Sequence, residues 1–146
     1  MRILAAADHG GFELKNLIVA HLRGRGFDLV DLGVNDGASV DYPDLARRAV
    51  ETYRGGGFEF GLLFCGTGIG ISIAANKMNG IRCALPFTPF MAEMARAHNN
   101  ANFLAFGGRV EYPVPVAALV DAFLAAKHEG GRHGDRVKKI HALEDT

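Results

Sequence analysis

The stretch "FEFGLLFCGTGIGISIAANK", residues 58–77, joins an apolar run to a glycine-rich turn, and the rest of the chain repeats this plan. Residues 58–65 form a short apolar run that predicts a buried strand. Glycines at 66, 68 and 70 predict a tight turn, and residues from about 71 to 78 predict a short helix. A strand, a turn and a helix in this order form one β-α unit of a parallel sheet.

Four further units of the same kind flank this one. Apolar runs at residues 2–7, 27–32, 81–86 and 102–107 predict strands, and apolar residues at helical spacing follow each of them. Five such units predict an α/β fold, a three-layer α/β/α sandwich of the Rossmann-like type with a five-stranded parallel sheet. We expect residues 1–146 to form a single domain of this class.

A last helical pattern lies outside these units. It is predicted at about 131–143, after "EGG" at 129–131, and it includes Val137 and Ile140 at helical spacing. Because no strand precedes it, we expect this extra C-terminal helix to lie across the domain or to pack on a partner subunit.

The composition excludes several classes of partner. Sixteen basic residues match sixteen acidic ones, so the overall field attracts neither nucleic acid nor a membrane surface. The longest uncharged run, residues 60–76, is shorter than the roughly 20 apolar residues of a membrane span. The first apolar stretch is too short for a secretory signal, and two cysteines make no disulfide framework. We therefore expect a cytoplasmic protein without nucleic-acid or membrane partners.

Polar residues and glycines gather where the predicted strands end. These segments are 8–9, 41–42, 65–70, 86–88 and 107–109. In open α/β sheets, ligands bind beyond the carboxyl ends of the strands. We expect a binding site among these five segments.

The glycine turn at 66–70 matches neither common phosphate-binding loop. It lacks the lysine of a Walker loop, and its third glycine comes one residue too early for the dinucleotide fingerprint. Glycines at this spacing do let main-chain amides point inward and hold an oxyanion, and the following helix adds its positive end. We expect these groups to favour the thiolate of Cys65 near neutral pH.

Two interpretations of Cys65 stay open on its surroundings alone. A thiolate at this position is suited to remove a carbon-bound proton next to a carbonyl group. A free cysteine at a strand end is also commonly a small core residue, which is what we expect of Cys83. Thr67 likewise has two roles open. It can hydrogen-bond an enediolate or relay a proton, or it can satisfy the N-terminus of the following helix.

His98 lies at the end of the fourth predicted helix, which begins at the carboxyl ends of the strands. About eleven residues at 1.5 Å each carry the chain roughly 16 Å toward the opposite edge of the sheet. Within one chain His98 should therefore lie far from Cys65, and a site that uses both needs His98 from a second subunit. The alternative is that His98 only stabilises the end of its helix.

Arg132 and Arg136 are one helical turn apart on the C-terminal helix, so their side chains share a face. Together with Arg109 or His9 they can form a bidentate grip on a phosphate group. The alternative is a pair of solvated surface charges. We take none of the six histidines as a zinc ligand, and we expect no metal.

Several segments resemble one enzyme family, and they occur in the family's order over nearly the whole length. They are "ADHGGFELK" (7–15), "VDYPDLA" (40–46), "CGTGIGISIAANK" (65–77), "GIR" (80–82), "RAHNNANFLAFGGR" (96–109) and "EGGRHGDRV" (129–137). The chain is similar to the sugar-phosphate isomerases of the ribose-5-phosphate isomerase B and galactose-6-phosphate isomerase family, in its cysteine-base type.

The resemblance implies an aldose–ketose isomerase that acts on a phosphorylated monosaccharide through a cis-enediol, without cofactor or metal. Ribose 5-phosphate and ribulose 5-phosphate are the implied pair, as in the pentose phosphate pathway of carbohydrate metabolism. It also implies a homodimer or tetramer with sites shared between subunits.

The resemblance further assigns roles to residues at matching positions. Cys65 is the implied base, His98 opens the sugar ring, and Thr67 stabilises the enediolate. The implied substrate-binding residues stabilise the enediolate, position hydroxyls or hold the phosphate, and they are Asp8, His9, Tyr42, Gly66, Gly68, Ile69, Gly70, Asn99, Arg109, Arg132 and Arg136.

One segment departs from the family's pattern. "LPFTPFMAEM" at 85–94 is more apolar than the polar, tyrosine-containing segment usual there. The substrate can therefore be a different four- or six-carbon sugar phosphate, of the erythrulose-4-, allose-6- or galactose-6-phosphate type. Two interpretations from different functional classes also stay open, a non-catalytic nucleotide- or ligand-binding module and a subunit that is active only with a partner chain.

Overall fold

The computed structural model describes residues 1–146, and its elements follow the expected order. Five strands form one all-parallel sheet with the order β2-β1-β3-β5-β4, which confirms the predicted α/β class. The strands are β1 (Arg2–Ala7), β2 (Asp28–Asp31), β3 (Phe60–Cys65), β4 (Cys83–Ala84) and β5 (Phe103–Gly107). The helices are α1 (Phe12–Gly24), α2 (Tyr42–Arg54), α3 (Ile69–Asn76), α4 (Pro89–Ala97), α5 (Val116–Ala125) and α6 (Gly131–Ala142), followed by the 3-10 turn η1 (Leu143–Asp145).

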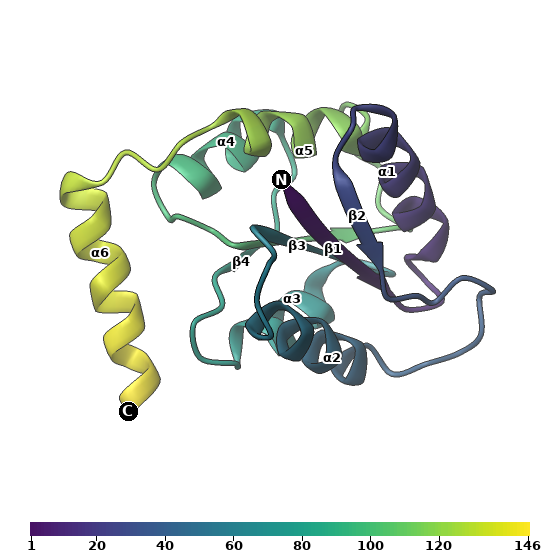
Figure 1. The fold of residues 1–146 in the computed structure, drawn as a ribbon, viewed down its shortest axis with the longest axis horizontal. Helices are drawn as coiled ribbons and strands as arrows, with labels where there is room; N and C mark the ends of the chain where they lie inside the picture. Colours follow the sequence, from purple (N-terminus) through teal and green to yellow (C-terminus); the bar gives the residue numbers. More distant parts are fainter.

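The sheet divides the apolar core into two clusters, because alternate side chains of a strand point to opposite faces. Helices α1, α4 and α5 cover one face, which includes Phe64 and Leu104. Helices α2 and α3 cover the other face, which includes Leu63, Cys65 and Phe103. Figure 1 shows these helices above and below the sheet, so the predicted three layers are confirmed.

The fourth strand is shorter than the predicted 81–86. Only Cys83 and Ala84 pair with β5, at the edge of the sheet. On the open side of this edge, the Asn76 side chain accepts from the Cys83 N–H at 2.7 Å and donates to the Cys83 carbonyl at 2.8 Å. The side-chain amide therefore satisfies the edge in place of a neighbouring strand. Pro86 comes two residues after the end of β4, and a proline has no N–H to continue a ladder.

Helix α6 stands apart from the three layers, as Figure 1 shows at the left of the view. Its far end meets the segment before β4, where Arg82 Nη1 lies 2.7 Å from His141 Nε2. The Gly80 N–H donates to Glu144 Oε1 at 2.7 Å. A groove of about 620 Å³ lies between this end of the chain and the β4 edge, and Ile140 and Leu143 line it. The helix thus leaves apolar side chains unpacked within the single chain.

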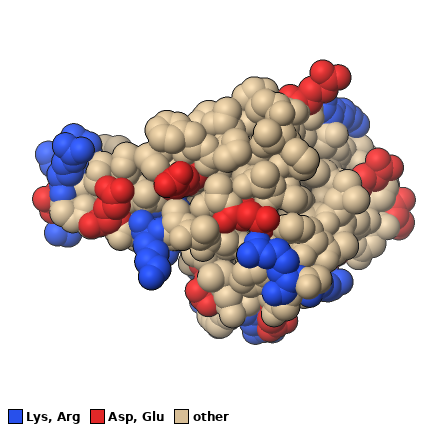
Figure 2. Space-filling view, turned by 90° about the horizontal axis from the view of Figure 1, so that it is seen from above, with Lys and Arg blue, Asp and Glu red and all other residues tan.

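Charged side chains are scattered over the face that Figure 2 shows, and no single sign dominates it. This distribution agrees with the equal numbers of acidic and basic residues. None of the helices has the length and apolar character that crossing a membrane requires.

Candidate active site

Cys65 is the last residue of β3 and lies at the carboxyl edge of the sheet. The residue is 4% exposed and packs with the α2/α3 layer. Its Sγ atom accepts a hydrogen bond from the Gly68 N–H at 3.1 Å. The contact places a main-chain donor against the sulfur at the start of α3.

Gly68 owes this contact to its backbone conformation. It precedes α3 with φ +79°, in the left-handed region. A β-carbon on residue 68 would also lie 2.6 Å from Leu85 Cδ1 and 2.9 Å from the Phe106 carbonyl carbon. Conformation and space therefore both require glycine at this position.

Thr67 and Ile69 flank Gly68 and are exposed. The Thr67 Oγ1 accepts from the Ile69 N–H at 3.2 Å, which is a cap contact at the start of α3. A hydroxyl that accepts through a lone pair still holds its own proton. The cap contact therefore leaves Thr67 able to donate to a ligand.

Two other loops pack on the glycine turn. The Asp8 side chain accepts from the Gly10 N–H at 2.8 Å, and a β-carbon on Gly10 would lie 2.9 Å from the Gly66 nitrogen. From the other side, the Gly108 N–H donates to the Cys65 carbonyl at 2.8 Å. These contacts fix the ends of β1, β3 and β5 to one another. His9 lies in the first of these loops with its side chain exposed.

Tyr42 and Arg109 come from different elements and lie against the same turn. Tyr42 is the first residue of α2, and a β-carbon on Gly70 would lie 2.6 Å from its ring. Arg109 follows β5, and a β-carbon on Gly66 would lie 3.2 Å from its guanidinium. The structure thus brings a phenol and a cation to the turn that holds Cys65.

Tyr112 is a neighbour of this site that the sequence patterns do not indicate. Its hydroxyl accepts from the Gly107 N–H at 2.9 Å. Burial raises the pKa of Tyr112, and the charge of Cys65 raises it further against the effect of the Gly107 hydrogen bond. The phenol therefore stays neutral beside the sulfur at physiological pH.

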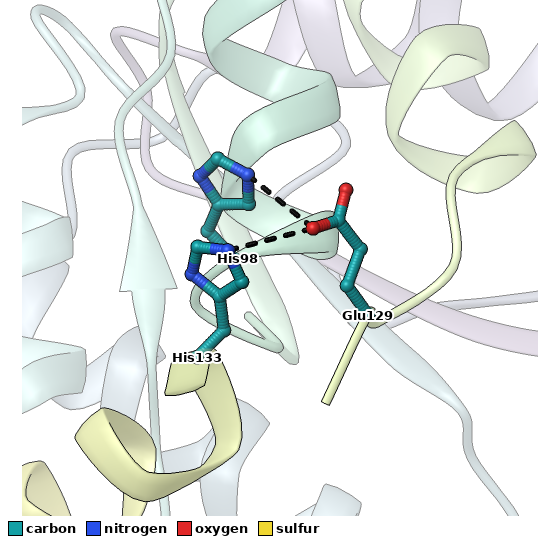
Figure 3. A group of neighbouring side chains, drawn as sticks. All are labelled: His98, Glu129 and His133. Atoms are coloured by element: carbon teal, nitrogen blue, oxygen red, sulfur yellow. Dashed lines mark ion pairs between the residues drawn. The ribbon is translucent and has the colours of Figure 1, made fainter. Parts of the chain in front are cut away.

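His98 belongs to a second group, shown in Figure 3, at the far end of α4. Its ring stacks on that of His133, with centroids 3.9 Å apart and planes at 5°. The Nε2 atoms of His98 and His133 lie 3.7 and 3.4 Å from the same Glu129 Oε2. One carboxylate therefore faces both rings.

Two arginines of α6 lie near this second group. Arg132 and Arg136 lie on α6 with exposed side chains. Burial lowers the pKa of His133, and the charges of His98, Arg132 and Arg136 lower it further while Glu129 opposes them. The positive charges of the two arginines therefore reach His133, and the negative charge of Glu129 opposes them.

Asn99 follows His98 and is exposed. Its carbonyl accepts from Arg82 Nε at 3.2 Å, and the residue lines the groove beside α6. The backbone of residues 99 and 100 is thereby tied to the segment before β4.

The structure divides the predicted site residues into two groups. The first surrounds the glycine turn and consists of Asp8, His9, Tyr42, Cys65, Gly66, Thr67, Gly68, Ile69, Gly70 and Arg109. The second lies where α4 ends and α6 begins and consists of His98, Asn99, Arg132 and Arg136. None of the three main hollows of the chain is lined by members of both groups.

Glu129 and His133 belong to this site although the sequence patterns did not single them out. Their four-residue separation is one that brings side chains together, and it was available in the sequence. The three donor atoms of His98, Glu129 and His133 lie within 4.8 Å of one another. The contact of His98 with this pair could not be predicted from the sequence, because it depends on how the loop after α5 returns to the end of α4.

Comparisons with known proteins identify relatives of the whole chain. The model of the Ribose/Galactose Isomerase family matches residues 3–140. The chain is 46% identical to ribose-5-phosphate isomerase B of Escherichia coli over 143 residues, which cover 98% of this chain and 96% of that protein. Two solved structures are also similar. Ribose-5-phosphate isomerase B of Clostridium thermocellum has a TM-score of 0.95 at 45% identity, covering 99% of this chain and 98% of that one. The enzyme of Mycoplasma genitalium with bound ribulose-5-phosphate has a TM-score of 0.89 at 41% identity, covering 99% and 96%.

Proposed function

The chain belongs to the ribose/galactose isomerase family, and from this premise we propose that it interconverts ribose 5-phosphate and ribulose 5-phosphate. The observation that carries the proposal is its similarity to ribose-5-phosphate isomerase B over almost the whole of both chains. A relative that this chain covers to 96% holds ribulose-5-phosphate in its structure, which identifies a five-carbon ketose phosphate as a ligand of that protein.

Cys65 is the base in this proposal. Its thiolate takes the proton from C2 of the open-chain aldose, and the electrons of that bond form a cis-enediolate with negative charge on O1. A proton passes from O2 to O1, and the thiol returns its proton to C1 to give the ketose. The amide of Gly68 at the start of α3 supports this role, because it already donates to the sulfur.

His98 opens the sugar ring before this transfer. Its imidazole takes the proton of the O1 hydroxyl and delivers a proton to the ring oxygen as the C1–O4 bond breaks, so the imidazole ends as it began. Asp8 and Asn99 position the hydroxyls, and Thr67 donates to the enediolate. The phosphate is held by His9, Arg132 and Arg136, with Arg109 and Tyr42 nearby.

We further propose that the two groups meet across a subunit interface in a homodimer or tetramer. Helix α4 starts after Thr88 at the carboxyl edge of the sheet, and its nine residues span about 14 Å toward the other edge. His98 contacts Glu129 and His133 of its own chain. Helix α6 carries exposed Ile140 and Leu143, which a second copy can cover.

The proposed chemistry uses only groups of the protein, and we expect no metal or cofactor to take part. Both cysteines are free thiols, and the base must stay reduced to work. A cytoplasmic protein that serves the pentose phosphate pathway fits this requirement.

The test is a panel of aldose and ketose phosphates with four to six carbons, incubated with the purified protein alone. We expect turnover of ribose 5-phosphate to exceed that of every other sugar by at least about tenfold. The exposed apolar side chains of Leu85, Phe87 and Phe90 give a reason to include the other sugars, since Leu85 packs directly on Gly68. Faster turnover of a four- or six-carbon sugar phosphate would change the assigned substrate but would leave the assigned reaction, aldose–ketose isomerisation, in place. No turnover of any sugar, together with stabilisation by nucleotides, would favour a binding module instead.

A further inference from the structure

The segment before α6 is fixed to the end of α4 by its backbone. The Glu129 N–H donates to the Ala97 carbonyl at 3.0 Å, and His128 Nδ1 lies 3.0 Å from the same oxygen. The His133 N–H donates to the Gly130 carbonyl at 3.1 Å. Ala97 directly precedes His98, so Glu129 and His133 are held at a fixed place relative to that imidazole.

The side chains then meet in one arrangement, which Figure 3 shows. The His133 side chain, 9% exposed, lies flat against one face of the His98 ring. The Glu129 carboxylate lies at the Nε2 edges of both rings. His98 itself keeps 37% of its side chain exposed, so the ring is held on one face and one edge and open elsewhere.

We propose that Glu129 and His133 are positioning residues that set the tautomer and the orientation of His98 for ring opening. The inference rests on the proposed function. A carboxylate accepts hydrogen bonds, so its place at Nε2 assigns the proton of neutral His98 to that nitrogen and leaves Nδ1 as the base toward the O1 hydroxyl. The stacked ring of His133 limits rotation of the imidazole about its Cβ–Cγ bond.

The distances from the Glu129 carboxylate to the two imidazoles agree with a role of His98 in proton transfer. At 3.4 and 3.7 Å the contacts are those of ion pairs, longer than formed hydrogen bonds. Catalytic hydrogen bonds are often long before substrate binds and tighten in the complex. The lowered pKa of His133 keeps that ring neutral, so the pair carries no second positive charge when His98 is protonated.

The same three side chains form a donor set that zinc uses in other proteins. Two features count against a cation here. The ring planes are parallel, so the Nε2 lone pairs run side by side and do not converge on one point. Arg132 and Arg136 also add positive charge next to His133. If Glu129 and His133 only position His98, the Nε2 lone pairs do not have to point to one atom, and the positive charges of Arg132 and Arg136 are no obstacle.

The test separates ring opening from proton transfer at carbon. Ribulose 5-phosphate has its O5 esterified and stays open-chain, so exchange of its C1 proton with D2O requires the base but not ring opening. We expect Glu129→Gln to lower kcat on ribose 5-phosphate about ten- to hundredfold, the range typical of lost orienting partners. The exchange rate, followed by proton NMR, should stay within about twofold of the parent. His133→Gln should likewise lower kcat on ribose 5-phosphate and leave the exchange rate nearly unchanged.

Glu93→Gln is the matched control, because Glu93 is exposed on the same helix as His98 and the substitution removes the same charge. It should change neither rate. Equal losses of turnover and exchange in Glu129→Gln would mean a general structural defect and would overturn the proposal, and so would unchanged turnover. A parent protein that neither isomerises nor exchanges would instead overturn the proposed function.

A spectroscopic measurement tests the inference without activity. In nitrogen-15 NMR, we expect the neutral His98 ring to carry its proton on Nε2, and Glu129→Ala to shift the population toward the Nδ1–H tautomer. An Nδ1–H tautomer in the parent protein would overturn the assignment. Activity that EDTA abolishes and Zn²⁺ restores would also overturn it, in favour of a metal site.

Discussion

The surroundings of Cys65 and of His98 are built in different ways. Cys65, its amide donor and the start of α3 come from consecutive residues, 65–70, and two loops lock this turn in place. His98 meets partners that lie 31 and 35 positions away in the sequence and that belong to the start of the projecting helix α6. In the proposed mechanism, the base that takes a proton from carbon is therefore buried in a locally built turn, and the imidazole that handles oxygen-bound protons is more exposed. The comparison suggests that exact placement matters more at Cys65.

Removing the sulfur should give the largest effect. We expect Cys65→Ala to lower kcat on ribose 5-phosphate at least about a thousandfold, because general-base catalysis contributes on the order of 10²–10⁴. Binding of the substrate, measured by calorimetry, should change little. Cys83→Ala is the control and should keep nearly full activity, since Cys83 lies at the β4 edge, where burial raises the pKa of its thiol. Turnover by Cys65→Ala at the parental rate would remove the assigned base.

Mixing two inactive variants tests whether the Cys65 and His98 of one active site come from the same subunit or from two subunits. If each site takes Cys65 from one subunit and His98 from the other, a mixed dimer of Cys65→Ala and His98→Gln has one intact site. After unfolding and refolding together, equal amounts should regain roughly a quarter of parental activity. The two variants refolded separately are the control. No recovery, with mixed dimers shown by mass spectrometry, would place each site within a single chain.

A substitution at Gly68 tests whether activity depends on the exact position of its amide against the Cys65 sulfur. Gly68→Ala should lower kcat about a hundredfold, because the residue must leave its φ of +79° or displace Leu85, and the amide then turns away from the sulfur. Gly80→Ala is the matched control, with φ +81° but open space around the added methyl group. It should cost about 1 kcal/mol of stability and little activity. Equal activity of the two variants would show that the amide contact is dispensable.

The smallest expected effect is on the pH dependence of the melting temperature, through His133 beside His98. His133 has its pKa lowered from the ordinary value of 6.5, so the unfolded chain binds a proton there before the folded chain does. Its contribution to stability is therefore complete above pH 6.5 and is lost as pH falls through the lowered value. Thermal unfolding of His133→Gln should show a shallower decline of Tm with acidification. His9→Gln, at an exposed histidine, is the control. An unchanged slope in His133→Gln would argue against the lowered pKa.

Particular residues show what could be predicted and what could not. The position of Cys65 at a strand end before a helix followed from the apolar run and the glycines, and β3 and α3 confirm it with bounds shifted by about two residues. The fourth strand was predicted too long, because before Cys83 the Asn102 side chain bonds to the Arg82 N–H and the Gly80 carbonyl in place of strand pairing, and Pro86 lies shortly after Ala84. The assigned roles of the site residues stay predictions that the experiments above address.

The sequence by itself determined the alternation of strands and helices, the faces of the sheet and the turn beside Cys65, because periodicity and glycine conformations act between near neighbours. Only the tertiary structure decided that β5 lies between β3 and β4, that Tyr42 and Arg109 contact the turn, and that Glu129 and His133 contact His98 on one edge and one face. Those contacts join residues far apart in the chain, and they depend on the paths of loops whose composition does not encode where they lead.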